Sequence, residues 1–446
     1  MQGVFGLALI LLLASCSCSM QQMMPWKMTD YFDLESQNND YETAFFGNDE
    51  QKLLGSAKSM SFNVMNYGAA GNGQTDDSEA FKKAWSDVCG ATSRDDAPTL
   101  LAPEGKTFVV NPVVFMGPCK SSIRFQIQGT LTAPQTTSWS HDSFGSLIQF
   151  RKVDNLIVEG SGTIDGQGAR WWNACIRKSD FVFGNKVGCQ QRPAVLVFSA
   201  CNGLQLKGLT HVNSPRAHVV IHGSKDITIS DIKISAPEKS PNTDGIDIST
   251  SSNIKIQDST IATGDDCVAI NGGTSFVNIT GVKCGPGHGI SIGSLGDGGD
   301  FDTVEEVHVS NCQLIKTTNG VRIKTFQGAS GYARKISFEH IRLENVENPI
   351  IIDQHYEDKS KRKPQLEFQQ SKVAAIKVSD ITYSDLHGTS NSDYAINLNC
   401  DDNVGCSGIK MKDVDITSAV PGKSTLASCQ NAHGTADSTQ PKVPCL

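Results

Sequence analysis

The chain has 446 residues and a formal net charge of −8, with 38% apolar and 19% charged residues. This is the composition of a folded globular protein, and the mild acidic charge gives no reason to expect nucleic acid as a partner. The length allows two or three ordinary domains, or one elongated domain of repeated β-strands, because repeat folds grow by adding coils.

The N-terminal segment is typical of a secretory signal. Residues 4–14, VFGLALILLLA, form an apolar run of signal-peptide length, and small residues follow it. The run is too short for a membrane span. Residues 13–16, LASC, also fit a bacterial lipoprotein cleavage pattern, but the lack of Lys and Arg before the apolar run disfavours both assignments equally. We predict a signal peptide over residues 1–18 and a secreted protein, extracellular or in a cell wall.

Residues 19–60 are predicted to be a propeptide or a flexible acidic tail. Between residues 29 and 50 there are seven acidic residues and no Lys or Arg, and the apolar residues show little periodicity. Such a segment lacks the apolar pattern that folding requires. We therefore expect the folded domain to occupy residues 61–446.

One helical pattern occurs near the start of this domain. Asp76 and Glu79 have the spacing of a helix capping box. The apolar residues that recur at helical spacing after them are Ala80, Phe81, Ala84, Trp85 and Val88. Since no comparable pattern follows Cys119, we expect one short helix near the N-terminus and β-structure beyond it.

A short alternating motif recurs along the rest of the chain. Each copy is an apolar–polar–apolar triplet followed by two polar or small residues, as in LQLKG, ITISD and IKIQD. The copies begin at Leu156, Leu204, Ile227, Ile254, Val277, Val307, Ile336, Ile376 and Ile409. The alternation predicts half-buried strands, and a period of 20 to 50 residues predicts a solenoid.

The spacing of this motif distinguishes between solenoids. The gaps from Leu204 onward range from 23 to 40 residues, too irregular for leucine-rich repeats, and no helical pattern falls between the strands. A β-sandwich also has short strands, but it would not repeat one signature at coil length. We predict an all-β fold, a parallel β-helix with a short N-terminal capping helix.

Polar residues recur at the start of a second set of strands. Asp244, Asp266, His288 and Asn319 each precede a small residue and an apolar–x–apolar strand, at steps of 22, 22 and 31 residues. If each step is one coil, these residues share one lattice position and lie about 4.8 Å apart from coil to coil. Asp265 lies beside Asp266 in this column.

The column predicts acid–base chemistry. Arg322 and Lys324 lie on the last of these strands at positions i and i+2, so both point to the same side. Carboxylates a few ångströms apart raise the pKa of at least one of them. A carboxylic acid beside a carboxylate is what glycoside hydrolysis requires. Because the two cations suit an anionic sugar, the pattern indicates hydrolysis of an acidic polysaccharide.

Aspartates can also cluster for structural reasons or to bind a metal. In solenoids, Asp at a strand end commonly binds its own backbone in a turn. We assign this structural role to Asp231, Asp258, Asp380 and Asp413. Clustered Asp oxygens also bind Ca²⁺, but Arg322 and Lys324 disfavour a cation in the column. We therefore expect no metal and no cofactor.

Twelve of the 14 cysteines follow the predicted signal peptide, and in an exported protein they indicate disulfides. No Cys/His group has zinc spacing. Cys267 is more simply a partner of Cys284, stapling two coils under the column, than a reactive thiol. The pairs close in sequence are Cys89 with Cys119, Cys175 with Cys189, Cys267 with Cys284, Cys400 with Cys406, and Cys429 with Cys445.

Glycosylation is predicted at one position. Asn278 begins the one sequon of the chain, Asn-Ile-Thr. In a secreted protein such a sequon predicts a glycan on the surface.

Four segments, in order, resemble the polygalacturonases of glycoside hydrolase family 28, particularly the plant enzymes. They are SPNTDGIDI from Ser240, TGDDC from Thr263, CGPGHGISIG from Cys284 and RIK from Arg322. Further similarities are YGA from Tyr67, IDGQGARWW from Ile164 and SPRAH ending at His218. The resemblance extends from about Phe62 to Cys445.

The resemblance implies a right-handed parallel β-helix that hydrolyses α-1,4 bonds between galacturonates with inversion. By this resemblance Asp265 is the general acid, and His288 supports its protonation. Asp244 and Asp266 hold the nucleophilic water. Because inverting enzymes keep their two carboxyls about 6.5–9.5 Å apart, we expect the side chains of Asp265 and Asp266 to diverge.

The resemblance also implies substrate-binding residues. Arg322 and Lys324 bind the galacturonate carboxylate, and Tyr356 lines the cleft. Plant relatives often carry a cysteine after this tyrosine, whereas here Glu357 and a basic loop follow it. The loop is a candidate for contacts with substrate carboxylates. The missing cysteine leaves two further cysteines as unpaired core thiols, Cys201 and Cys312.

The sequence favours a polygalacturonase of endo or exo action that binds pectic homogalacturonan. It predicts no nucleic-acid partner, no membrane association of the mature form, and a monomer. A rhamnogalacturonan hydrolase on the same scaffold is the closest alternative, and the two cations favour plain galacturonate. A pectate lyase would need calcium, and a β-helix that binds pectin without cutting it would not need the three aspartates.

Overall fold

The computed structural model describes residues 60–93, 96–135, 145–176, 192–357 and 374–446. All of them belong to one compact unit, Gly55–Leu446. The predicted signal peptide, nearly all of the predicted acidic tail and the basic loop after Glu357 lie outside what is described. Within the described residues, no helix is long and apolar enough to cross a membrane.

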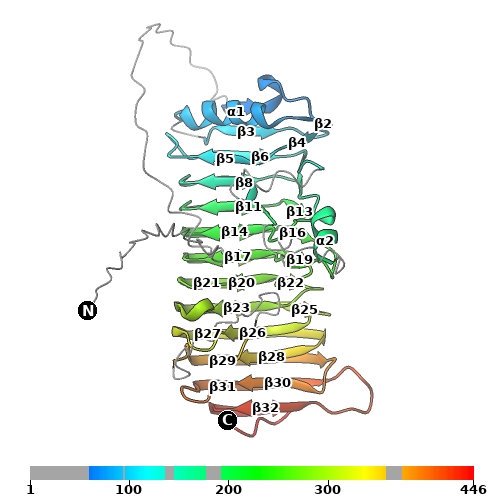
Figure 1. The fold of residues 1–446 in the computed structure, drawn as a ribbon, viewed down its shortest axis with the longest axis vertical. Helices are drawn as coiled ribbons and strands as arrows, with labels where there is room; N and C mark the ends of the chain where they lie inside the picture. The colour runs from blue at the N-terminus through cyan, green and yellow to red at the C-terminus, as the bar shows by residue number, and fades with distance from the viewer. Residues whose placement is uncertain (1–59, 94–95, 136–144, 177–191, 358–373) are drawn as a thin grey trace, which may run out of the picture. The chain divides into compact units, whose positions relative to one another are not determined.

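Parallel strands dominate these residues and stack one above another (Figure 1). Sheet B contains 11 strands, and each pairs with the next of them along the chain. They are β5 (Val113–Met116), β8 (Ser146–Arg151), β11 (Ala194–Ser199), β14 (Val219–His222), β17 (Ile246–Ser249), β20 (Val268–Ile270), β23 (Ile290–Leu295), β26 (Asn319–Thr325), β28 (Asn348–Asp353), β30 (Tyr394–Asn399) and β32 (Leu426–Gln430).

Sheet A contains the other 22 strands, which also pair in parallel. They are β1 (Ser61–Asn63), β2 (Asn72–Asp76), β3 (Thr99–Ala102), β4 (Thr107–Val109), β6 (Arg124–Ile127), β7 (Thr130–Thr132), β9 (Ile157–Glu159), β10 (Thr163–Asp165), β12 (Gln205–Lys207), β13 (Thr210–Val212), β15 (Lys225–Ser230), β16 (Lys233–Ser235), β18 (Ser252–Gln257), β19 (Thr260–Ala262), β21 (Thr274–Thr280), β22 (Lys283–Cys284), β24 (Phe301–Ser310), β25 (Gln313–Ile315), β27 (Ser330–Val346), β29 (Lys377–Ser390), β31 (Cys406–Ser418) and β33 (Ala432–Gln440).

The register of sheet A confirms the predicted β-helix. Ile227 pairs with Ile254, Ile254 with Val277, and the ladder continues through Val307 to Ile336. These residues are buried, so the apolar positions of the repeat form continuous interior stacks. Burial of each apolar side chain stabilises the fold by roughly 1.5–3 kcal/mol relative to exposure.

One copy of the repeat was placed wrongly. The motif predicted at Ile376 begins instead at Ile381, because Ile336 pairs with Ile381 and Thr382 with Lys410. Two adjacent segments, IKVSD from Ile376 and ITYSD from Ile381, both fit the motif, and Ile376 is buried as well. The motif alone therefore cannot fix which of the two pairs with the neighbouring coil.

The corners between strands carry the predicted turn aspartates. Asp231, Asp258, Asp380 and Asp413 have φ values of 55°, 50°, 56° and 55°. This left-handed backbone is favoured by Asp and Asn among non-glycine residues, because their short side chains bond to the local backbone. The prediction that these four are corner residues is confirmed.

Helix α1 (Ser78–Gly90) is the predicted N-terminal helix, but its cap differs from the prediction. The N-cap residue is Asp77, and Asp76 Oδ1 accepts a hydrogen bond from the Ser78 amide at 3.0 Å. Glu79 forms an exposed ion pair with Lys82 instead of closing a capping box. The capping-box prediction was therefore wrong, because Asp76 bonds to the first turn from outside the helix.

The apolar face of α1 packs on the first coils. The ring centroid of Phe81 lies 5.4 Å from that of Phe108, and the ring centroid of Trp85 lies 4.8 Å from that of Phe115. A second helix, α2 (Ala169–Ile176), was not predicted; it begins within the IDGQGARWW segment. Short 3₁₀ turns, η1 and η3, cover Val64–Tyr67 and Asp297–Gly299.

Four of the five predicted cysteine pairs are present as disulfides, and the two cysteines predicted to be unpaired are buried free thiols, Cys201 and Cys312. The four disulfides are Cys89–Cys119, Cys267–Cys284, Cys400–Cys406 and Cys429–Cys445.

The fifth predicted pair, Cys175 with Cys189, is not among these disulfides. Cys175 lies in the last turn of α2. Its predicted partner, Cys189, lies outside the described residues, between the end of α2 and residue 192. A disulfide between Cys175 and Cys189 therefore stays a prediction.

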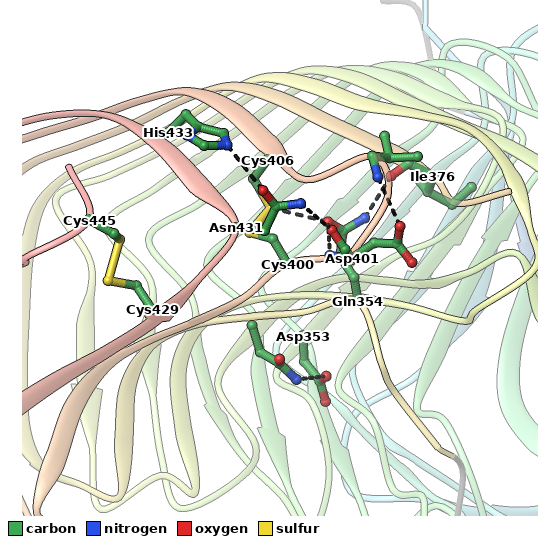
Figure 2. The surroundings of a disulfide bond; sticks show 12 residues. Asp353, Gln354, Ile376, Cys400, Asp401, Cys406, Cys429, Asn431, His433 and Cys445 are labelled. Carbon is green, nitrogen blue, oxygen red and sulfur yellow. Dashed lines mark hydrogen bonds between the residues drawn. A yellow bond between two sulfur atoms is a disulfide. The ribbon is translucent and has the colours of Figure 1, made fainter. Parts of the chain in front are cut away.

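Near the C-terminus, side chains tie successive coils together. Figure 2 shows the last two disulfides in this region, with Gln354 near Cys400–Cys406. Gln354 donates a hydrogen bond to the Ile376 carbonyl (2.7 Å) and accepts one from the Asp401 amide (3.1 Å). Gln354 is 1% exposed, so both of these bonds are made in the interior.

One interior position of sheet A holds a histidine. His211 pairs with Ile164 on one neighbouring coil and Ile234 on the other, and all three are buried. Among the described residues, neither ring nitrogen of His211 has a hydrogen-bond partner. Burial and the neighbouring His218 lower the pKa of His211 to about 3, so it stays neutral.

We expect His211→Ile to stabilise the protein and to reduce its sensitivity to acid. The folded-state pKa lies below the ordinary value of 6.5, so the unfolded chain binds more protons as pH falls below 6.5, and stability is lost towards pH 3. At pH 5 this loss is about 2 kcal/mol. Removing the unpaired ring adds roughly 1–3 kcal/mol at neutral pH.

Chemical denaturation at pH 7 and at about pH 5 measures both effects. The variant should have the higher free energy of unfolding at each pH, and the advantage should grow at the lower pH. An unchanged advantage between the two pH values would show that His211 takes up its proton in the folded state.

Candidate active site

The register of sheet B builds the predicted polar column. Strands β17, β20, β23 and β26 pair in sequence, with Ile246 opposite Val268, Val268 opposite Ile290, and Ile290 opposite Val321. Two positions before these residues, at the same place on successive coils, are Asp244, Asp266, His288 and Asn319. Acids that are far apart in sequence are thereby brought together.

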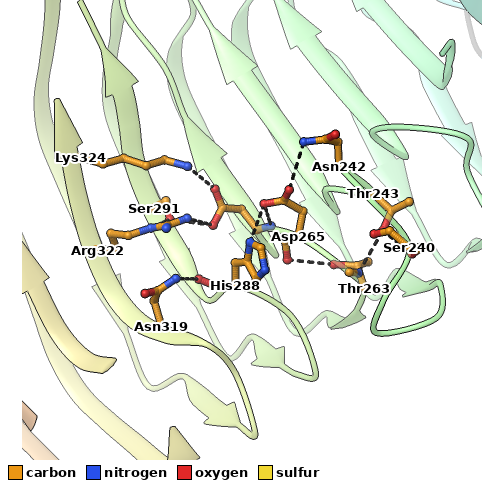
Figure 3. Close-up of polar contacts among 12 residues, drawn as sticks. Ser240, Asn242, Thr243, Thr263, Asp265, His288, Ser291, Asn319, Arg322 and Lys324 are labelled. Atoms are coloured by element: carbon orange, nitrogen blue, oxygen red, sulfur yellow. Dashed lines mark hydrogen bonds and ion pairs between the residues drawn. The ribbon is translucent and has the colours of Figure 1, made fainter. Parts of the chain in front are cut away.

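Asp266 lies at the centre of the site and is 1% exposed. Its Oδ1 accepts hydrogen bonds from Arg322 Nη2 (2.7 Å) and Ser291 Oγ (2.8 Å), and its Oδ2 accepts one from Lys324 Nζ (2.8 Å). Figure 3 labels Arg322, Ser291 and Lys324, the three residues that donate these bonds. Burial alone would raise the pKa of Asp266, but Arg322 and Lys324 lower it to about 2. Asp266 is therefore an ionised carboxylate throughout the physiological pH range.

Both predicted substrate-binding cations are held by this carboxylate. Lys324 Nζ also lies 5.4 Å from the centroid of the Tyr356 ring, within the range of a cation–π contact. The Tyr356 ring in turn packs edge-on against Phe326, with centroids 5.3 Å apart. The structure thus brings Arg322, Lys324 and Tyr356 together beside Asp266, as the resemblance implied.

Asp265 forms a pair with His288. His288 Nδ1 lies 2.9 Å from Asp265 Oδ1, and the His288 amide donates to the Asp265 carbonyl at 2.7 Å. Asn242 Nδ2 donates to the other oxygen, Oδ2, at 3.4 Å. Burial opposes a charge on His288, but the hydrogen bond and the charge of Asp265 raise its pKa overall. The pair can therefore hold a proton next to Asp266.

Asp247 is a further acid of the site that was not predicted from the sequence. This residue lies on β17, is 7% exposed, and its Oδ1 is buried without a hydrogen-bond partner among the described residues. Burial raises the pKa of Asp247 to about 6, although Arg216 opposes the shift. Burial and then the charge of Asp247 raise the pKa of Asp244 well above its ordinary value.

The spacing of about 22 residues from coil to coil could have predicted the position of Asp247. Asp247 pairs with Ala269, Ala269 with Ser291, and Ser291 with Arg322, so all four lie in one row of sheet B. The same steps that aligned the first column also align this row. Ser291, which bonds to Asp266, could have been found in the same way.

The predicted divergence of Asp265 and Asp266 stays a prediction. One carboxylate oxygen of each lies within 4.8 Å of the other and of a His288 ring nitrogen. This is a distance between nearest atoms, whereas the separation of about 6.5–9.5 Å usual for inverting enzymes is between whole carboxyl groups. Both oxygens of Asp266 are bound by the cations, while the Asp266 amide donates to Asp265 Oδ1 at 2.9 Å and holds the Asp265 side chain against the backbone of its neighbour.

The backbone around the column is fixed by a disulfide and a glycine. Cys267–Cys284 joins the segment that carries Asp266 to the loop before His288. Gly289, with φ +85°, follows His288, and a Cβ there would lie 2.2 Å from the Asn319 carbonyl oxygen. Only glycine fits such a close approach of neighbouring coils.

Asp265, Asp266 and His288 are close enough together to share a cation. However, Asp266 already binds Arg322 and Lys324 through both of its oxygens, at 2.7 and 2.8 Å. Two positive charges at these distances disfavour a divalent ion. The arrangement suits acid–base chemistry better than metal chemistry.

The fold and this site define a carbohydrate-cleaving β-helix, and comparison with known proteins identifies its family. Residues 89–440 match the model for glycosyl hydrolases family 28. The chain belongs to this family and is a glycoside hydrolase.

Among curated relatives, a probable polygalacturonase of Arabidopsis thaliana is 46% identical over 393 residues, which are 87% of this chain and 81% of the relative. An exopolygalacturonase of Zea mays is 40% identical, covering 86% and 90%. A polygalacturonase of Persea americana is also 40% identical, covering 82% and 76%.

Solved structures agree on the fold. An endo-xylogalacturonan hydrolase of Aspergillus tubingensis superposes with a TM-score of 0.69, at 24% identity, over 85% of this chain and 99% of that one. An exopolygalacturonase of Thermotoga maritima superposes with a TM-score of 0.64, at 21% identity, over 81% and 89%.

Asn278 lies apart from the column, on sheet A. It is an exposed residue of β21, between the buried residues Val277 and Ile279. A glycan at Asn278 would therefore point outward from sheet A, whereas the acid–base column belongs to sheet B. Glycosylation at this residue remains a prediction.

We expect Asp247→Asn to move the acidic limb of the pH profile of kcat/KM to lower pH. Because the charge of Asp247 raises the pKa of Asp244, an amide at position 247 lets Asp244 ionise at lower pH. The hydrolysis rate measured from about pH 3 to pH 8 tests this.

Asp258→Asn is a matched control, since Asp258 is a corner residue on sheet A and Asn tolerates its backbone conformation. The control should leave the profile unchanged. A profile of Asp247→Asn identical to that of the control would contradict the coupling between Asp247 and Asp244.

Proposed function

We propose that this chain is a polygalacturonase that hydrolyses α-1,4-galacturonosyl bonds of pectic polygalacturonate. The observation that carries the proposal is the arrangement around Asp266: a permanently ionised carboxylate, fixed by Arg322 and Lys324, next to the proton-sharing pair Asp265–His288. Plant relatives at 40–46% identity that carry the name polygalacturonase support this choice of substrate.

Asp265 is the general acid in this proposal. It is half-buried in the site, and it shares a hydrogen bond with His288, whose pKa is raised. The proton shared by His288 Nδ1 and Asp265 Oδ1, 2.9 Å apart, resides on Asp265 when Asp265 transfers it to the leaving glycosidic oxygen. His288 is a positioning residue that keeps this proton available.

Asp244 and Asp266 hold the attacking water. Asp266 accepts three hydrogen bonds from the protein, so its lone pairs are engaged and it is poorly suited to attack the sugar itself. Asp244 is half-buried, and its raised pKa makes it the stronger base when ionised. Attack by a water held here, opposite the leaving oxygen, inverts the anomeric configuration.

Positive charge on two sides of the acids favours an anionic substrate. Arg322 and Lys324 lie on one side, next to Tyr356. Arg192 interacts electrostatically with Asp244 and Asp265, and Arg216 interacts electrostatically with Asp247. Arg216 is exposed, so it is available to a sugar carboxylate.

The same scaffold could serve a rhamnogalacturonan hydrolase, the alternative that the sequence left open. The flanking cations favour a substrate that carries a carboxylate on each sugar. We infer a secreted, cell-wall location and a monomer that contacts pectin but neither nucleic acid nor membrane, in keeping with the predicted signal peptide and the disulfides.

We expect Asp265→Asn to lower kcat on polygalacturonate by roughly 10²–10⁴-fold, the usual contribution of a general acid. The asparagine keeps the shape of the side chain but cannot donate the proton. A reducing-sugar assay measures the loss, and circular dichroism checks the fold. Asp258→Asn should retain full activity. Full activity of Asp265→Asn would contradict the assigned role.

The stereochemistry of the first product tests the role of the water. Attack by water predicts that the β-anomer of galacturonate appears first from the α-linked substrate, followed by mutarotation. Proton NMR during the first minutes of hydrolysis distinguishes the two anomers. The α-anomer appearing first would show that a carboxylate attacks the sugar, and unsaturated products would show that the enzyme is a lyase.

A further inference from the structure

A second cluster of titratable side chains lies on sheet A, whereas the acid–base column lies on sheet B. It comprises two histidines and two aspartates from three strands that pair in succession: His340 on β27, Asp385 and His387 on β29, and Asp413 on β31. We call these four residues the His–Asp cluster. The proposed hydrolysis uses none of them.

The carboxylate of Asp385 lies at the centre of this cluster. Its Oδ2 is 2.6 Å from His340 Nδ1, and its Oδ1 is 2.7 Å from His387 Nε2. His387 Nε2 is also 3.6 Å from Asp413 Oδ2. Donor atoms of Asp385, His387 and Asp413 all lie within 4.8 Å of one another. Three potential metal ligands, from Asp385, His387 and Asp413, therefore converge, while His340 binds the other oxygen of Asp385.

The β-helix itself creates this convergence. His340, Asp385 and Asp413 each have a φ of 55°, the left-handed corner conformation. The residues that follow them, Ile341, Leu386 and Val414, pair from strand to strand. The three corners are therefore stacked on consecutive coils, and the relative positions of their side chains are set by backbone pairing.

We propose that the His–Asp cluster binds a divalent transition-metal ion of the zinc class. One imidazole nitrogen of His387 and one carboxylate oxygen each of Asp385 and Asp413 are donors that zinc accepts, with water in the fourth position. With bonds of roughly 2.0–2.2 Å, neighbouring donors of a tetrahedral site lie about 3.3 Å apart. The separations of 2.7 and 3.6 Å from His387 Nε2 to Asp385 Oδ1 and Asp413 Oδ2 lie on both sides of this value, so small side-chain movements suffice. His340 Nδ1, 2.6 Å from Asp385 Oδ2, orients the Asp385 carboxylate.

The cluster is accessible to an ion from solvent. The side chains of His340 and Asp413 are 58% and 61% exposed, while those of Asp385 and His387 are 26% and 30% exposed. A solvent-open hollow of about 380 Å³ lies beside them, and His340 and Asp385 are among the residues that line it. An ion could therefore enter without opening the fold.

Arg342 is the one positive side chain paired with the cluster among the described residues, and its competition is weak. Its Nη1 lies 3.5 Å from Asp385 Oδ1, and the side chain is 59% exposed, so it can turn away into solvent. The contrast with the catalytic acids is clear, because Arg322 and Lys324 lie within 2.8 Å of Asp266 and are 12% and 9% exposed. The negative charge of the two carboxylates exceeds the positive charge of this one exposed guanidinium, so a metal ion could neutralise the remainder.

A bound ion would join two consecutive coils, because its ligands lie on β29 and β31. These strands would then be linked by side chains as well as by backbone hydrogen bonds, and His340 on β27 would be tied to the site through Asp385. An ion that binds the folded state and not the unfolded state raises stability by mass action. The bound ion would therefore stabilise the fold, and occupancy of the site can be measured without any assay of hydrolysis.

Isothermal titration of the EDTA-treated, dialysed protein with ZnCl₂ tests the proposal. We expect one zinc ion per chain, an increase in the melting temperature with zinc, and no comparable binding of Mg²⁺, which prefers oxygen ligands. In His387→Gln the affinity should fall about tenfold or more, because one of three protein ligands is lost. Co²⁺ should give the intense visible absorption of a tetrahedral N/O site.

Matched variants locate the ion. His308→Gln removes a histidine that is 54% exposed and lies 3.7 Å from Glu306, so it resembles the cluster histidines, but it should leave zinc binding intact. Asp265→Asn should also leave it intact, which excludes binding at the catalytic acids. Arg342→Gln removes the competing charge and should tighten binding severalfold.

Three results would overturn the proposal: no zinc binding to the unmodified protein, equal affinity in His387→Gln and His308→Gln, or loss of binding in Asp265→Asn. Circular dichroism verifies that each variant is folded. Because none of these measurements depends on polygalacturonate, failure of the zinc site would leave the proposed hydrolytic function untouched.

Discussion

The in-register pairing of parallel strands is the constraint on which the rest of this structure depends. Each coil returns the backbone to the same place, so side chains that are 22 residues apart in sequence become neighbours about 4.8 Å apart. In sheet B this brings Asp244, Asp266 and His288 together. In sheet A the same geometry stacks Ile227, Ile254 and further apolar residues into the core. One rule of pairing thus produces both the stability and the site.

The charges and burial around the stacked acids then shift their pKa values in different directions. Asp266 remains ionised because Arg322 and Lys324 bind both of its oxygens. Asp244 has a raised pKa because it is buried among other carboxylates. Acid–base catalysis needs one carboxyl group that is ionised and another that keeps a proton, and residue types alone do not provide this difference. It arises because the two cations lie on the coils beyond Asp266 and reach back to it.

The sequence predicted the parts of this arrangement that follow from periodicity. The β-helix, the order of the column and most cysteine pairs could be predicted because a repeated apolar pattern and short loops leave few alternatives. The register of β29 could not, since IKVSD from Ile376 and ITYSD from Ile381 both fit the repeated motif. The closeness of Asp265 and Asp266 was also missed, because it depends on a hydrogen bond between neighbouring residues that no pattern records.

We propose that a galacturonate chain binds and is cleaved on the outward face of sheet B around Asp266. A crystal structure of the Asp265→Asn variant with a galacturonate oligomer tests this proposal most directly. We expect a glycosidic oxygen within hydrogen-bond distance of residue 265 and a sugar carboxylate close to Arg322 and Lys324. An oligomer bound on sheet A, or one whose glycosidic bonds all lie away from Asp244 and Asp266, would contradict it.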